Sequence, residues 1–119
     1  MRISVIIALF LASPANAQPF SKSMAECGGL YAFARAHVES PDAVALLEFG
    51  QAKWINAAIV QSQSEGVSDP ATYVEATMTA NYQEWTDKGA LAVFSEEFGD
   101  WMDYCRAFGR AQGIALLPD

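Results

Sequence analysis

Apolar side chains along residues 90–112 recur at alternating spacings of three and four residues, the spacing that places them on one face of an α-helix. This stripe consists of Leu91, Phe94, Phe98, Trp101, Cys105 and Phe108. Residues 23–39 repeat the pattern with Met24, Cys27, Tyr31, Ala34 and Val38. We therefore expect two amphipathic helices, each with one cysteine in its apolar stripe.

Local start and stop signals indicate where the helices begin and end. Residues 40–42, Ser-Pro-Asp, supply an N-cap, a proline for the first helical position and an acid for the first turn. Residues 69–70, Asp-Pro, repeat the signal, and residues 23–26, Ser-Met-Ala-Glu, have the form of a capping box. Gly66 and Gly89 stand where a chain leaving a helix adopts positive φ. The predicted helices span residues 23–39, 41–65, 70–88 and 90–112, and no stretch alternates long enough to predict a strand.

The two cysteines, Cys27 and Cys105, lie in the first and the last predicted helix. One lies near the start of its helix and the other near the end, so they come level if these helices are antiparallel. We predict an all-α, up-down-up-down four-helix bundle, with a disulfide bond that contributes up to about 4 to 5 kcal/mol. The adjacent Gly28-Gly29 pair lowers helix propensity. We interpret it as a close approach of the last helix, with a hinge as the alternative.

The second predicted helix is apolar on nearly all sides. Its apolar residues are Val44, Leu46, Leu47, Phe49, Trp54, Ile55, Ala57, Ala58, Ile59 and Val60. A helix that is apolar on two sides needs two partners. We expect this helix to be the most buried element, or to be covered on one face by a second copy in a homodimer.

Residues 1–17 have the order of segments found in secretory signal peptides. Arg2 precedes an apolar run over residues 3–12, Pro14 follows, and residues 15–17 are Ala-Asn-Ala. The run is about ten residues long, half of the roughly 20 that a membrane-spanning helix needs. We expect cleavage after Ala17, a periplasmic or extracellular location, and one soluble domain over residues 18–119. The oxidising compartment also favours a disulfide over two free thiols.

Acidic residues outnumber basic ones, with 14 Asp and Glu against 7 Lys and Arg, and the net charge is −7 at pH 7. Loss of Arg2 with the signal peptide would make the charge −8. A field of this sign repels nucleic acid and anionic lipid, and it favours either solubility alone or a basic protein or peptide as partner. We expect no binding to nucleic acid and none to membranes.

Carboxylates gather on the outer face of the last predicted helix. Glu96, Asp100 and Asp103 fall on one side, opposite the apolar stripe, and Glu97 lies on its flank. A solvated face is the simplest interpretation, and a docking surface for a basic partner is the sharper hypothesis. Acids at these helical spacings lack the loop oxygens that calcium prefers, so we predict no metal site.

His37 is the only histidine in the sequence, which excludes multi-histidine metal sites. A partly buried structural histidine is the simplest interpretation of it. If Glu96 or Glu97 reached it from the antiparallel last helix, the pKa of His37 would rise and it would become a pH-responsive contact. The sequence contains no Cys-x-x-Cys-His haem motif, Gly-rich phosphate loop or nucleophile motif. We therefore predict no cofactor and no catalytic residue.

In size, helix content and single bridge, the predicted domain is similar in shape to two groups of small exported proteins, the acid-stress chaperones and the immunity proteins against secreted cell-wall amidases. The bridge between terminal helices is more similar to the immunity group. The leading hypothesis is a non-catalytic binding or inhibitor-like protein that acts through the acidic helix face or an aromatic surface patch. An acid- or stress-responsive periplasmic chaperone is the alternative, and an enzyme of unknown type is a minor one.

Overall fold

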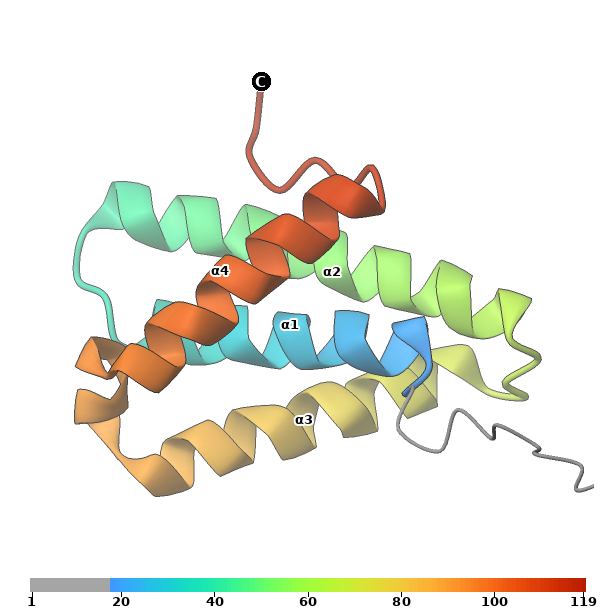
Figure 1. The fold of residues 1–119 in the computed structure, drawn as a ribbon, viewed down its shortest axis with the longest axis horizontal. Helices are drawn as coiled ribbons and strands as arrows, with labels where there is room; N and C mark the ends of the chain where they lie inside the picture. Colours follow the sequence, from blue (N-terminus) through green and yellow to red (C-terminus); the bar gives the residue numbers. More distant parts are fainter. Residues whose placement is uncertain (1–17) are drawn as a thin grey trace, which may run out of the picture.

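The structure, a computed structural model, describes residues 18–119 as four α-helices and one short 3₁₀ helix (Figure 1). The elements are α1 (Phe20–Ala36), α2 (Pro41–Ser64), α3 (Pro70–Lys88), η1 (Ala90–Phe94) and α4 (Glu96–Ala111). No strand occurs in this part of the chain. The predicted signal peptide, residues 1–17, lies outside the described residues.

Successive helices run in alternating directions, which confirms the predicted all-α, up-down-up-down fold. Figure 1 shows α1 lying between α2 and α3, while α4 crosses obliquely over the side of α1 that those two helices leave free. The bridge also forms as predicted. Cys27 and Cys105 are 78 residues apart in sequence, their Cα atoms are 5.8 Å apart, and both are buried. The disulfide therefore fixes α4 to the middle of the fold.

The first helix begins three residues earlier than predicted, because its start is capped by a distant residue instead of a local box. The carboxylate of Glu65, at the end of α2, accepts hydrogen bonds from the hydroxyl and the backbone N–H of Ser21, the latter at 3.2 Å. Ser23 and Glu26 do not cap each other. Both accept hydrogen bonds from the side-chain amide of Gln18, at 2.7 and 2.6 Å.

The first helix also ends at Ala36 instead of residue 39. The backbone N–H of His37 turns back to the carbonyl oxygen of Ala34 at 3.1 Å, a tighter turn than the helix makes. The ring Nδ1 of His37 lies 2.9 Å from the carbonyl oxygen of Phe33. His37 therefore contacts two carbonyl oxygens at the end of the helix, one through its backbone N–H and one through its ring, and the helix does not continue.

The prediction of one helix over residues 90–112 was wrong in its first turn and a half. Residues 90–94 form the 3₁₀ helix, and α4 starts after Ser95, whose side-chain oxygen accepts a hydrogen bond from the Phe98 N–H at 3.1 Å. Leu91 and Phe94, assigned to the apolar stripe, are 79% and 84% exposed. The apolar spacing continued across a turn, and the cap at Ser95 is what separates the two elements.

The most buried element is α1, and the expectation that the second helix would be most buried was wrong. Only one narrow stripe of α2 is buried, at intervals of four residues: Gly50, Trp54, Ala58 and Ser62. Its Leu46 and Val60 are 43% and 66% exposed. In contrast, eleven residues of α1 are buried, so this helix is enclosed by its three neighbours.

Small residues in α1 allow this enclosure. A Cβ atom on Gly29 would lie 2.6 Å from the carbonyl oxygen of Met78 and 2.8 Å from Oδ1 of Asn81, both on α3. The neighbouring Gly28 has only ordinary contacts, with Met78 and Trp54 side-chain atoms at 3.6 to 3.7 Å. The glycine pair does mark a close approach, but the approaching helix is α3, not the last helix as predicted.

Aromatic contacts hold α4 on both sides of the disulfide. Phe98, near its start, meets Trp85 of α3 edge to face with ring centroids 5.6 Å apart. Phe108, beyond the bridge, stacks on Trp54 of α2 with centroids 5.7 Å apart. Together with the bridge, these contacts hold α4 over α1 at a fixed angle, and they leave both flanks of α4 open.

Candidate functional site

A groove lies along one flank of α4, next to the disulfide. The start of α1 and the end of α3 form its opposite wall. Its deeper part has a volume of about 150 Å³ and reaches the disulfide, and its wider outer part has a volume of about 680 Å³. We call it the acidic groove, defined by Glu26, Glu84, Glu96, Glu97, Asp100, Trp101 and Tyr104.

Three of the four acids predicted as a partner-binding face line this groove, namely Glu96, Glu97 and Asp100. The fourth, Asp103, lies outside it and forms an ion pair with Arg106 at 2.5 Å. The groove residues that sequence reasoning missed are Glu26, Glu84, Trp101 and Tyr104. Glu26 and Glu84 belong to α1 and α3, so no pattern within α4 could have indicated them.

Two aromatic rings form the exposed part of the groove wall. Trp101 and Tyr104 are 47% and 43% exposed, and their ring centroids are 5.4 Å apart in an edge-to-face arrangement. Tyr104 also stacks on Phe108, with centroids 5.8 Å apart. Trp101 was assigned to the inward stripe from its spacing. The inward face of α4 instead carries Cys105 and Gly109, so Trp101 lies on the flank.

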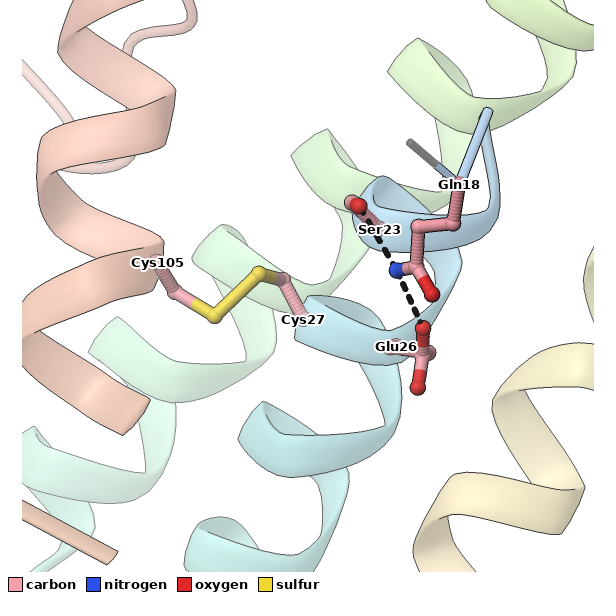
Figure 2. The surroundings of a disulfide bond; sticks show 5 residues. All are labelled: Gln18, Ser23, Glu26, Cys27 and Cys105. Carbon is pink, nitrogen blue, oxygen red and sulfur yellow. Dashed lines mark hydrogen bonds between the residues drawn. A yellow bond between two sulfur atoms is a disulfide. The ribbon is translucent and has the colours of Figure 1, made fainter. Parts of the chain in front are cut away.

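The polar rim of the groove is organised by Gln18 and Lys88. Figure 2 shows the Gln18 amide donating to both Ser23 and Glu26, next to the Cys27 half of the bridge. On the other side, the Lys88 ammonium pairs with Glu97 at 2.8 Å and lies 5.1 Å from the centre of a Trp85 ring. Lys88 is the one basic residue among the side chains that line the groove.

His37 lies at the other end of α1 and is not part of the groove. Among residues 18–119, no carboxylate oxygen comes within the 4.0 Å ion-pair distance of its ring. Its ring lies against Phe33, with centroids 4.4 Å apart. Glu97, which was considered as its partner, pairs with Lys88 instead.

The side chains that line the acidic groove are of the types that attract positive charge. Carboxylates attract a cation, and the faces of Trp and Tyr rings hold an ammonium or guanidinium group by cation–π attraction. In the described part of the chain, no three His, Cys, Asp or Glu side chains converge as a metal site would require. Among these residues, no helix combines the length and apolar character needed to cross a bilayer.

The chain was compared with protein-family models, with curated proteins and with solved structures, and none of the three comparisons gives a match.

Proposed function

We propose that this chain is an exported, non-catalytic binding protein that holds a basic segment of a partner protein in its acidic groove. One observation carries the proposal: carboxylates from α1, α3 and α4 converge on a groove whose exposed wall is the Trp101–Tyr104 pair. Trp and Tyr are enriched among the residues that dominate binding energy at protein interfaces.

The groove fits a peptide segment better than a compact ion. Its outer part is wide and open, and its acids are spread along about a turn of α4 instead of around one point. An incoming arginine would stack on Trp101 and compete with Lys88 for Glu97. The surrounding negative charge would speed the encounter with a basic partner.

The disulfide supports this role because it fixes the spacing of the two groove walls. Cys27 belongs to the α1 wall and Cys105 to α4, and both line the deep part of the groove. A wall that is already in place does not have to be ordered when the partner binds. The bridge is also compatible with an oxidising compartment. The proposed cleavage after Ala17 would make Gln18 the first residue, at the rim of the groove.

The test begins with affinity capture from envelope extract, followed by purification of the captured protein and calorimetric titration with the wild-type chain. The variant Glu96→Lys/Asp100→Lys reverses two groove charges, and Glu39→Lys/Glu75→Lys reverses two exposed acids outside it. We expect the groove variant to bind at least about tenfold more weakly, and the control variant within about twofold of wild type. Trp101→Ala should weaken binding by a similar factor.

Two results would count against the proposal. Equal weakening by both double variants would mean that only the net charge attracts the partner. Unchanged binding by the groove variant and by Trp101→Ala would place the contact elsewhere on the molecule.

A further inference from the structure

A second groove lies on the opposite flank of α4 and shares no lining residue with the acidic groove. It lies between the first half of α2, the middle and end of α4 and the chain that follows α4, and its volume is about 580 Å³. Its apolar walls include Leu46, Leu47, Met102 and Leu117. We call it the apolar groove. Its volume is in the range of roughly 300 to 1,000 Å³ that is typical of small-molecule sites.

The chain after α4 is folded back to build one wall of the apolar groove. Gly113 has a φ of 71°, which reverses the chain, and the N–H of Ile114 then donates to the Gly109 carbonyl at 2.8 Å. Leu116 packs so closely on α4 that a Cβ atom on Gly109 would lie 2.8 Å from it. This wall is therefore held by backbone hydrogen bonds and by packing on a glycine.

Positive charge lines the apolar groove although the chain as a whole is acidic. Arg106 and Arg110, one helical turn apart on α4, are the charged residues in its lining. Arg106 pairs with Asp103, and Arg110 has no carboxylate within 4.0 Å among residues 18–119. Burial raises the pKa of Tyr31, at the base of the groove, against the opposing effects of Trp54 and Arg106, so its hydroxyl adds no negative charge.

We propose that the apolar groove binds a free medium-chain fatty acid, with its hydrocarbon chain between α2 and α4 and its carboxylate at Arg106 and Arg110. The apolar lining accounts for the chain, and charge complementarity accounts for the head group. An arginine guanidinium matches a carboxylate with two parallel hydrogen bonds. A carboxylate would also relieve the repulsion between two arginines that are four residues apart on one helix face. This site is independent of the basic partner proposed for the acidic groove.

The test is calorimetric titration of the chain, with its bridge intact, using dodecanoate below its micelle concentration. Dodecanol and dodecyltrimethylammonium serve as neutral and cationic head-group probes. We expect dodecanoate to bind one to one, and both other amphiphiles to bind at least about tenfold more weakly. Arg106→Gln/Arg110→Gln should lose at least about tenfold in dodecanoate affinity, whereas Arg35→Gln, which breaks the Arg35–Glu48 pair elsewhere, should stay within about twofold.

Far-UV circular dichroism and the melting temperature check that each variant is folded. Arg110→Gln alone provides the same test at an exposed residue if the double variant is destabilised. No binding of dodecanoate, equal binding of all three amphiphiles, or unchanged affinity in the arginine variants would overturn the proposal. So would a concentration-dependent dimer that dodecanoate does not dissociate, because a second copy would then cover the groove.

Discussion

Helices α1 and α4 have nearly the same length, 17 and 16 residues, and are joined by one disulfide, yet their surroundings are opposite. Eleven residues of α1 are buried, against two of α4, so α1 is the centre of the packing and α4 covers one side of it. Both grooves are built on α4. We therefore expect stability to depend mainly on α1, and both proposed binding sites lie on α4.

This difference follows from side-chain size. At the contact with α3, α1 has glycine, and its other buried positions include Ala25, Ala34 and two serines. Small side chains on α1 let the other three helices pack close to its axis. The outer side of α4 instead has large polar and aromatic residues, which leave grooves where they meet the neighbouring helices. Substitutions in the two helices should therefore have separable effects.

The largest effect is expected from removal of the disulfide, because it is the covalent cross-link that ties α4 directly to α1. Cys27→Ala/Cys105→Ala should lower the free energy of unfolding by about 3 to 4.5 kcal/mol, where the upper figure is the chain-entropy value for a loop of 78 residues. A loss of about 3 kcal/mol corresponds to a fall in melting temperature of roughly 12 to 24 °C. Calorimetry measures the change. Two titratable thiols in the denatured, non-reduced wild type would show that the bridge is absent.

A smaller effect is expected inside α1, at two adjacent glycines with different surroundings. Gly29→Ala should destabilise the fold by about 1 to 3 kcal/mol, because the new methyl group meets the Met78 carbonyl oxygen at 2.6 Å. Gly28→Ala is the matched control. Its nearest contacts are at 3.6 to 3.7 Å, and it should be neutral or gain up to about 1 kcal/mol from better helix propensity. Urea denaturation distinguishes the two, and equal losses would contradict the close approach of α3.

The parts of the fold that could be predicted from sequence are those with local causes. Pro41 and Pro70 follow side chains that cap the helix start, and these two helices begin where predicted. Gly66 and Gly89 have φ of 82° and 96°, as expected where a helix ends. The start of α1 could not be predicted in this way, because its cap, Glu65, is 44 residues away in sequence.

The burial of α1 was missed for a similar reason. A core helix is identified in the sequence by its apolar residues, and α1 has serines and glycines at several buried positions. The more apolar α2 was therefore predicted to be the most buried helix. The candidate site divides in the same way. The α4 acids Glu96, Glu97 and Asp100 could be predicted from the pattern of one helix. Glu26 and Glu84 join them only through tertiary packing.

A still smaller, pH-dependent effect is expected where α2 caps α1. Desolvation works to raise the pKa of the exposed Glu65 carboxyl, but hydrogen bonds from the Ser21 hydroxyl, from Gln61 and from the Ser21 N–H outweigh it, so the pKa is lowered. A lowered folded-state pKa adds stability that is full above the unfolded pKa and is lost as the pH falls through the folded value. Solvent screens the exposed Glu65 carboxylate, so Glu65→Gln should cost less than about 1 kcal/mol at pH 7 and lose this deficit in acid.

Denaturant titrations at pH 7 and at pH 3 measure this dependence. Glu75→Gln, which removes one exposed acid of α3, is the control for the loss of a single negative charge. A deficit of Glu65→Gln that stays constant between the two pH values would mean that the carboxylate charge does not stabilise the cap.

The smallest effect on stability is expected from substitutions on the outer face of α4. The comparison with α1 predicts that they leave the stability of the fold almost unchanged. Glu96 lies in the first turn of α4, where a negative charge interacts favourably with the helix dipole. Its neutralisation should therefore lower the free energy of unfolding by a few tenths of a kcal/mol. Removal of charge at Asp100 relieves repulsion with neighbouring acids and acts in the opposite direction. Glu96→Gln/Asp100→Asn should thus stay within about 0.5 kcal/mol of wild type in urea denaturation, even though the proposed partner binds more weakly. A loss above about 1 kcal/mol would show that these acids support the fold, and the proposed division between a structural α1 and a binding α4 would then fail.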